Sequence, residues 1–295
     1  MMEARIGTRF WLAISIGAPG SMIDIHHDIT LGRRERSTAL DGMTLNEVVY
    51  PAGCRFEPHA HEQANISILL AGSFFEQAGS LSSHCKTCSV VFKPPQTVHR
   101  NEVGSRGARS LIIGIQPDRF ERWCNWSETL KRYAWVHTGP IPELMLRLYR
   151  EFRLGDDLSV ASLEQLLLEV LSTDFELSTS RMKTAMPLWM RQVMERLHEP
   201  REAMPRVDIL ARTVGVHPVH LARVFRRHHK CTIAQYIRRR RLEKATHALS
   251  SSRKPLAEIA YETGFADQAH FSRSFKTHAG LSPGQFRRMT SVGTS

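Results

Sequence analysis

The spacing of apolar residues divides the chain into a strand-rich part and a helical part. Between about residues 44 and 115, short apolar runs are separated by turn residues such as Pro51-Ala-Gly, Ala71-Gly72 and Glu102-Val-Gly. This alternation predicts strands over residues 44–50, 66–70, 73–77, 89–93 and 110–115. Closely spaced strands without a helical period are typical of a small β-barrel or sandwich.

Beyond Pro117 the apolar period becomes that of a helix. Residues 141–152 and 158–177 place leucines three and four positions apart, which predicts two amphipathic helices. One apolar face contains Leu163, Leu166, Leu167, Val170 and Leu171. Packing on the barrel and pairing with a second copy of the chain explain such a face equally well. The polar stretch 178–186 has no period, so we expect a linker there.

The rest of the chain, from Pro187, is predicted to be helical. We expect helix stops at Glu199-Pro200, Gly215, residues 250–252, Gly264 and residues 280–283. Charge separates the same two parts, because residues 187–295 contain 20 Lys and Arg against 8 Asp and Glu, while the preceding part is almost neutral. A basic surface at one end indicates contact with a polyanion, with nucleic acid as the first candidate and an anionic membrane as the second.

An internal repeat lies within this basic part. Residues 209–227 read ILARTVGVHPVHLARVFRR, and residues 258–277 read EIAYETGFADQAHFSRSFKT. The aligned pairs are Ala211 with Ala260, Gly215 with Gly264, Leu221 with Phe271, Arg223 with Arg273, and Phe225 with Phe275.

Each repeated residue type has a physical role in a helix-turn-helix unit. The small alanine is needed where the first helix crosses closely over the second. The glycine four positions later ends the first helix, because only glycine adopts a left-handed conformation at low cost. The four-residue spacing of the large apolar pair leaves the residues between them free to enter a major groove. We therefore expect two helix-turn-helix units that bind double-stranded DNA.

Over roughly residues 187–288 the chain resembles the AraC/XylS family of bacterial transcription regulators. The most specific match lies in the second repeat, in Ile259-Ala260, Gly264-Phe265, Phe271-Ser-Arg273-Ser-Phe275-Lys276, Gly280-Leu-Ser-Pro283 and Phe286-Arg287. The stretch 232–249 is similar to the family's long connecting helix at Tyr236-Ile237, Arg241-Leu242, Ala245 and Leu249. Lys230 replaces a glycine of the first unit, which changes a helix cap and leaves DNA binding expected.

The resemblance implies which side chains face DNA. They are Val219, Ala222 and Arg223 in the first recognition helix, and Gln268, Ala269, Ser272 and Arg273 in the second. Arginine can bind guanine through two hydrogen bonds and glutamine can bind adenine, so we expect the second helix to discriminate more between bases. A salt bridge or phosphate contact is the alternative for either arginine. Phosphate contacts are expected from Arg226, Arg227, Lys276 and residues 238–240, although residues 238–241 surround their helix and cannot all face DNA.

Two motifs in the strand-rich part resemble those of the cupin barrel. Gly53, His59 and His61 match the first motif, and residues 94–101, which include His99, match the second. Metal-binding cupins add a glutamate to these three histidines, but Asn65 or Ile66 stands at its place. We expect no cofactor; the alternative is a divalent metal ion on His59, His61 and His99, with Cys85 or Cys88 as a further ligand. A small-molecule effector pocket is the role that the resemblance implies.

These features predict an α+β protein in three parts. They are a cupin-like effector domain over residues 40–118, a helical dimerisation or linker segment over 119–186, and an all-α domain with two helix-turn-helix units over 187–290. We expect a cytoplasmic transcription activator or repressor that is not an enzyme. Its expected partners are DNA, a small-molecule effector, a second copy of the chain and RNA polymerase.

Two alternative functions remain at this point. A metal-dependent cupin enzyme would use the three histidines, but it leaves the basic repeat unexplained. A protein that lies on anionic membranes needs a continuous apolar face opposite its charges, whereas here the apolar positions are those that fold a compact unit.

The remaining sequence signals concern location. No apolar run approaches the roughly 18 to 20 residues of a membrane-spanning helix, so we expect no membrane insertion. The stretch 10–16, after Arg5 and Arg9, only marginally resembles a signal peptide, and a non-native start before Met22 explains it equally well. The cysteines at positions 54, 85, 88, 124 and 231 lack the spacing of a disulfide framework, which fits a reducing cytoplasm.

Overall fold

The computed structural model describes residues 24–26, 31–125, 127–155, 157–173, 186–198, 207–229 and 231–290. The chain separates into two compact units, Met1–His137 and Thr138–Gly293. The stretch 10–16, Glu199-Pro200, Lys230 and all of the expected linker except Met186 lie outside the described residues.

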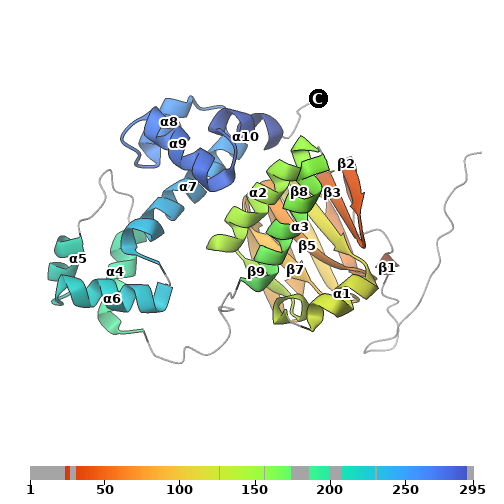
Figure 1. The fold of residues 1–295 in the computed structure, drawn as a ribbon, viewed down its shortest axis with the longest axis horizontal. Coiled ribbons are helices and arrows are strands. Elements are labelled where there is room, and N and C mark those ends of the chain that lie inside the picture. The colour runs from red at the N-terminus through yellow and green to blue at the C-terminus, as the bar shows by residue number, and fades with distance from the viewer. Residues whose placement is uncertain are drawn as a thin grey trace, which may run out of the picture. The chain divides into compact units, whose positions relative to one another are not determined.

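The described part of the first unit forms one sheet of nine strands (Figure 1). The strands are β1 (Asp24–His26), β2 (Arg33–Leu40), β3 (Met43–Tyr50), β4 (Arg55–His61), β5 (Ala64–Ala78), β6 (Leu81–Lys86), β7 (Val90–Lys93), β8 (His99–Ile115) and β9 (Ala134–Val136). Their order is β1-β4-β8-β5-β7-β9, with β2 on β3, β3 on β8 and β6 on β5. Helix α1 (Pro117–Cys124) and the 3-10 helix η1 (Glu128–Lys131) lie between β8 and β9 in the chain. The sheet therefore extends on both sides of residues 40–118.

The two longest strands differ from the sequence prediction. Ala71-Gly72 was expected to separate two strands, but β5 runs through it with register shifts against β8. Gly72 has a φ of 81°, and a Cβ there would collide with the Gly107 carbonyl oxygen. The glycine thus allows the strand to bend at a bulge and does not end it. The turn predicted at Glu102-Val-Gly is also wrong, because strand β8 continues through these residues.

Besides the short strands β1 and β9, three strands without a clear apolar alternation were missed, namely β2, β4 and β6. Each exposes most of its residues or carries polar side chains on its inner face. The alternation is clear in β5, where Ile66, Ile68 and Leu70 are fully buried in the core. Asn65 and Ser67, on the opposite face of the same strand, line a cavity inside the sheet.

The second unit begins with two helices that pack on each other, α2 (Pro140–Leu154) and α3 (Asp157–Ser172). Both agree with the predicted helices as far as the described residues reach. Of the predicted apolar face, Leu163, Leu167, Val170 and Leu171 are already buried in the single chain. Leu166 is half-buried, so packing within the chain accounts for most of this face.

The predicted all-helical region is confirmed over its described residues. It contains α4 (Leu188–His198), α5 (Val207–Thr213), α6 (Pro218–His229), α7 (Ile233–Ser251), α8 (Leu256–Glu262), α9 (Gln268–Ala279) and α10 (Pro283–Thr290). The long helix α7 starts at a capping box, in which Thr232 and Gln235 satisfy each other's backbone amides. Figure 1 shows α4–α6 grouped at one end of α7 and α8–α10 at the other. No helix in the described ranges is long and apolar enough to cross a membrane.

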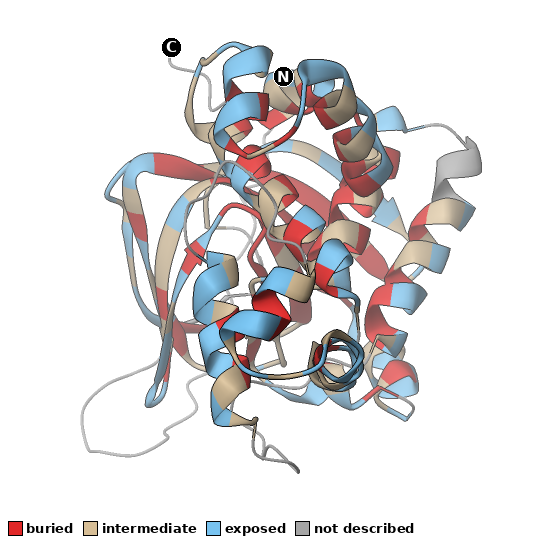
Figure 2. Cartoon of the chain, turned by 90° about the vertical axis from the view of Figure 1, so that its left-hand side faces the viewer, coloured by how far each residue is buried: buried red, intermediate tan, exposed pale blue. Residues whose placement is uncertain are grey.

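Each group of helices has its own apolar core. Buried residues lie in stripes along the helices, with exposed residues between them (Figure 2). The first core contains Met190, Val193, Leu210, Ala211, Leu221, Phe225, Ile233 and Ile237. Fully buried aromatic side chains of the second group are Phe271, Phe275 and Phe286.

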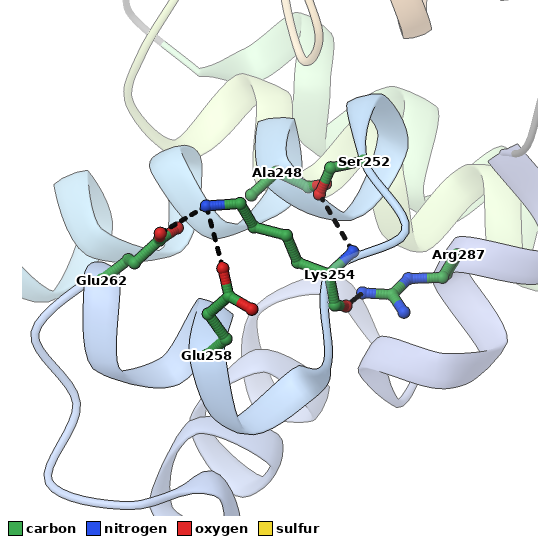
Figure 3. A network of polar contacts seen from close by, with 6 residues as sticks. All are labelled: Ala248, Ser252, Lys254, Glu258, Glu262 and Arg287. Atoms are coloured by element: carbon green, nitrogen blue, oxygen red, sulfur yellow. Dashed lines mark hydrogen bonds and ion pairs between the residues drawn. The ribbon is translucent and has the colours of Figure 1, made fainter.

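A network around Lys254 ties α7, α8 and α10 together (Figure 3). Its Nζ lies 3.1 Å from Glu258 and also contacts Glu262, and these two carboxylates raise the pKa of the lysine. Arg287 of α10 donates to the Lys254 carbonyl oxygen at 2.6 Å. The Ser252 hydroxyl, just after the end of α7, donates to the Ala248 carbonyl oxygen at 2.8 Å. These contacts hold the second helical group as one unit.

Candidate nucleic-acid interface and effector pocket

Helices α5 and α6 form the first helix-turn-helix unit, joined by a turn at Gly215. The Gly215 amide donates to the Arg212 carbonyl at 3.2 Å. The Val216 amide reaches back to the Ala211 carbonyl at 3.0 Å. With a φ of 68° at Gly215, these two bonds make a Schellman end to α5. Ala211 is fully buried, as the close approach of the two helices requires.

Helices α8 and α9 repeat this arrangement at Gly264. The Gly264 amide donates to Tyr261 at 2.9 Å, and the Phe265 amide donates to Ala260 at 2.9 Å. Gly264 has a φ of 82°, and Ala260 is buried. Equivalent residues therefore make equivalent hydrogen bonds in both units, which confirms the repeat and its glycine stops.

The second helix of each unit buries one face and exposes the other. Leu221 and Phe225 of α6, and Phe271 and Phe275 of α9, are fully buried. The residues expected to contact DNA lie between and beyond them. Ser272 is half-buried, and the exposed ones are Val219, Ala222, Arg223, Arg226, Arg227, Gln268, Ala269, Arg273 and Lys276. Every predicted position thus lies on a solvent-accessible face of α6 or α9.

Most basic side chains on these faces have no acidic partner. Within the described ranges, no salt bridge is formed by Arg226, Arg227, Arg273 or Lys276. Arg223 lies 3.4 Å from the Nδ1 of His220, also on α6. The salt-bridge alternative for Arg223 and Arg273 is therefore not supported by neighbours in this part of the chain, and both guanidinium groups face solvent.

The arginine run of α7 surrounds its helix, as expected. Arg238 is exposed, and Arg240 lies 3.7 Å from Glu243 on the same helix. Arg241 is half-buried beside Gly264, and burial lowers the pKa of its guanidinium. Only part of this run can therefore face a nucleic acid.

One expectation in this region is corrected by the structure. Arg239, expected to contact phosphate, donates instead from Nε to the Glu143 carboxylate of α2 at 2.7 Å. His278 of α9 is buried, and its Nδ1 lies 3.5 Å from the same carboxylate. Both depend on a helix far away in sequence, which local pattern does not reveal.

The sheet of the first unit encloses a cavity of about 50 Å³. The residues that line it come from five strands and the segment before β2. They are Leu31, Tyr50, Phe56, His59, His61, Asn65, Ser67, Phe74, Glu76, Val91, Lys93, His99, Asn101, Ser110 and Ile112. Because a buried water needs roughly 10–15 Å³ by this measure, the cavity has room for only a few small groups.

The three predicted histidines meet in this cavity. His59, His61 and His99 are buried, and their candidate ligand atoms all lie within 4.8 Å of one another. The Nδ1 of His59 lies 2.7 Å from the Glu57 carbonyl, and that of His99 lies 2.9 Å from the Thr97 carbonyl. A carbonyl oxygen can only accept a hydrogen bond, so each of these carbonyls places the ring proton on Nδ1 and makes Nε2 the unprotonated nitrogen.

The donor set fits a divalent metal ion. The Nε2 of His99 is buried and makes no hydrogen bond within the described residues. Burial, reinforced by the positive charge of Lys93 and by His59, lowers the pKa of His99 to about 2, so its imidazole is neutral. Neutral imidazole nitrogens fixed by carbonyls are the form in which histidine binds metals.

The alternation of side chains along β5 decides which residue, Asn65 or Ile66, occupies the place of the cupin glutamate. Asn65 lines the cavity, whereas Ile66 is in the core, so an amide stands near the three imidazoles. The cysteines expected as further ligands are absent from the only cluster of potential metal ligands among the described residues. Cys85 belongs instead to an apolar cluster, and burial raises its thiol pKa to about 12. That expectation is wrong.

Sequence reasoning missed a buried ion pair in the same cavity. Glu76 is buried and lies 2.5 Å from the Nζ of Lys93. Asn101 donates to the carboxylate at 2.6 Å, and Trp135 of β9 donates at 2.7 Å. Burial alone would raise the pKa of Glu76, but Lys93 and these donors outweigh it and lower the pKa. The sequence signal that could have revealed this ion pair is the charged Glu76 at an inward position of the mostly apolar strand β5.

Comparison with known proteins identifies two domains in the chain. A family model described as an AraC-like ligand binding domain matches residues 49–171, and a helix-turn-helix domain model matches residues 210–289. Regulatory protein SoxS of Escherichia coli is 33% identical over 81 residues, which are 28% of this chain and 76% of SoxS. The chain belongs to the AraC/XylS family of transcription regulators. This AraC-family chain therefore has a DNA-binding domain and an N-terminal ligand-binding domain.

Two longer relatives span both domains of the AraC-family chain. The arabinose operon regulatory protein of Escherichia coli is 29% identical over 215 residues, 69% of this chain and 73% of that protein. The Msm operon regulatory protein of Streptococcus mutans is 25% identical over 187 residues, 60% of this chain and 66% of that protein. Both of these relatives are regulatory proteins by name.

Proposed function

We propose that this AraC-family regulator binds a DNA site of two short boxes in the cytoplasm and responds to a small molecule held in its barrel. The observation that carries the proposal is the equivalence of the two turns at Gly215 and Gly264, connected by the single helix α7. Two units joined by one continuous helix present α6 and α9 to successive major grooves, about 34 Å apart.

The two recognition helices differ in chemistry, and we assign them different roles. On α9, Arg273 and Gln268 can form paired hydrogen bonds with guanine and adenine, respectively. On α6, Val219 and Ala222 offer only apolar contact, while the last turn is basic. The second unit would then determine more of the base preference, and the first would mainly anchor the protein on phosphates.

The cavity composition favours a small polar effector without net charge. Its one carboxylate and one ammonium, Glu76 and Lys93, neutralise each other, and the imidazole of His99 is neutral. In a cavity without a metal ion, a charged ligand would be desolvated without a free counterion. Tyr50, Phe56 and Phe74 add an aromatic wall.

We also propose that His59, His61 and His99 hold a divalent metal ion, with Asn65 beside them. A bound ion would supply a Lewis-acidic centre for an effector with oxygen donors. The carbonyls of Glu57 and Thr97 would orient the rings of His59 and His99.

Association of two copies is part of the proposal. Leu168 of α3 is 43% exposed and would offer an apolar contact to a second copy. A dimer would place four recognition helices on one operator. If the protein activates transcription, RNA polymerase is its further partner.

Selection from a pool of random duplex DNA by the purified full-length protein tests the proposed function. We expect enrichment of two boxes about one helical turn apart, with an affinity that falls steeply with salt. Repeating the selection with pools of small metabolites should change the affinity or the spacing. Binding without sequence preference, or without salt dependence, would contradict the proposal.

A further inference from the structure

A cationic groove of about 500 Å³ lies between α2, α7 and α9 in the second unit. Arg147 of α2, Arg238 and Arg239 of α7, and Arg273 of α9 line it. The only carboxylate among its lining residues belongs to Glu143 of α2. Four guanidinium groups around one carboxylate leave an excess of positive charge, which favours binding of a further anion.

Glu143 occupies this groove as an internal anion. Its Oε1 accepts a hydrogen bond from Arg239 Nε at 2.7 Å and lies 3.5 Å from His278 Nδ1. Burial alone would raise the pKa of Glu143, but His278 and Arg239 outweigh it and lower the pKa. The carboxylate is therefore ionised at neutral pH.

The helix that carries Glu143 is held against the recognition helix by further contacts. Arg147 donates to the Thr277 carbonyl at 3.2 Å, and Arg150 donates to the Gly280 carbonyl at 3.3 Å. Both acceptors lie at the C-terminal end of α9, where cationic donors stabilise the free carbonyls. α2 thus holds Glu143 in the groove that Arg273 also lines.

Arg238 and Arg273 are two groove cations without an acidic partner among the described residues. Both are exposed, and neither forms a salt bridge within the described ranges. Arg273 also lies on the face of α9 assigned to DNA. A duplex on that face brings backbone phosphates to the mouth of the groove, and a phosphate binds a guanidinium through the same paired geometry as a carboxylate.

We infer that a backbone phosphate of bound DNA enters this groove and displaces the Glu143 carboxylate from Arg239. The inference rests on the proposed DNA-binding function. Two anions so close together repel each other, so Glu143 acts as an internal competitor that weakens DNA binding. Arg239, which pairs with Glu143 in the structure, would then contact phosphate only after the Glu143 carboxylate has left.

The test compares wild-type full-length protein with Glu143→Gln on the DNA sequence obtained by selection. Affinity is measured by fluorescence anisotropy at several salt concentrations. Without the competing charge we expect tighter binding by Glu143→Gln and a slope of log affinity against log salt that is steeper by about 0.9, the value for one added phosphate contact. The double variant Glu143→Gln, Arg239→Gln should lose this added slope.

Glu169→Gln serves as the matched control, since Glu169 is an exposed carboxylate on α3 outside the groove. It changes the net charge equally and should retain the wild-type slope. Circular dichroism at each salt concentration checks that the variants are folded. If Glu143→Gln does not fold, Arg239→Gln in the wild-type background must weaken DNA binding, because it removes the guanidinium that the displacing phosphate contacts; an unchanged affinity would overturn the inference.

The outcomes separate the two proposals. Specific DNA binding by the wild type together with an unchanged slope in Glu143→Gln overturns the groove proposal alone. Absence of specific DNA binding by the wild type overturns both. Titration with inorganic phosphate forms a third arm: if phosphate stabilises Glu143→Gln against heat while its DNA slope equals that of the wild type, the groove binds a free anion and our inference is wrong.

Discussion

The indole nitrogen of Trp135 donates a hydrogen bond to the Glu76 carboxylate at 2.7 Å, which joins the last strand of the sheet to its polar interior. Lys93 neutralises the same carboxylate. An effector that enters the cavity must therefore share or replace the partners of a buried, fully hydrogen-bonded charge. The ion pair is consequently the part of the pocket whose energetics can be tested directly.

Replacement of Lys93 by methionine should destabilise the first unit strongly. Glu76 would then be a buried charge without its counterion, and breaking such a pair costs about 3–5 kcal/mol. Urea unfolding followed by Trp fluorescence measures the loss. The double variant Glu76→Leu, Lys93→Met removes both charges and should recover most of the stability. A single variant as stable as the wild type would show that the pair is not desolvated.

The two turn glycines should respond differently to alanine. Gly215→Ala places its Cβ in open space, so only the left-handed backbone is penalised, by about 1–2 kcal/mol. Gly264→Ala has the same backbone penalty, and its Cβ also lies 3.0 Å from the Arg241 side chain. Thermal unfolding should rank Gly264→Ala as the less stable variant. The opposite order would mean that Arg241 moves aside without cost.

Arg273→Ala and Arg226→Ala should affect DNA binding in different ways. Arg273 is assigned to a base, so its loss should relax preference at one position and cost about 1–3 kcal/mol. Arg226 is assigned to phosphate, so its loss should weaken binding equally on all sequences and reduce the salt slope by about 0.9. Binding to a panel of single-base variants measures both. If Arg273→Ala lost the same affinity on every single-base variant, Arg273 would contact the DNA backbone and not a base.

The imidazole cluster predicts zinc uptake by the purified protein. After dialysis against zinc and removal of free ions, elemental analysis should find bound metal in the wild type and none in the His59→Ala, His61→Ala variant. A chelator should lower the thermal stability of the wild type and leave the variant unchanged. Cys85→Ser is the control, because its thiol lies in the apolar cluster and should not alter metal content. Equal metal content in the wild type and the histidine variant would refute the site.

The Glu143 ion pair predicts a pH dependence of stability. Its folded-state pKa is below the ordinary value of 4.5, so the folded chain binds fewer protons than the unfolded chain as pH falls. The advantage of wild type over Glu143→Gln should therefore be fully present above pH 4.5 and disappear as pH falls through the folded-state pKa. Urea unfolding of both proteins across this range measures the difference. An advantage that grows on acidification would contradict the sign of the pKa shift.

The DNA-binding half could be predicted in detail because its determinants are local. The alanine and glycine of each turn lie four positions apart, and the hydrogen bonds that they make span only a few residues. Which side chains face solvent on α6 and α9 follows from helical geometry alone. The first half was predicted less well, because β4 and β6 have little apolar alternation and the glycine at position 72 bends β5 without ending it.

The sequence by itself determined the two helix-turn-helix units, the outward face of each recognition helix and the three histidines of the barrel. Only the tertiary structure decided that Asn65 and not Ile66 lies in the cavity, that Glu76 is buried against Lys93, and that Glu143 holds Arg239. The last two residues are 96 positions apart. Such contacts depend on how elements far apart in sequence pack together. The local pattern of apolar and polar residues does not show which distant charged residue will lie beside a given one.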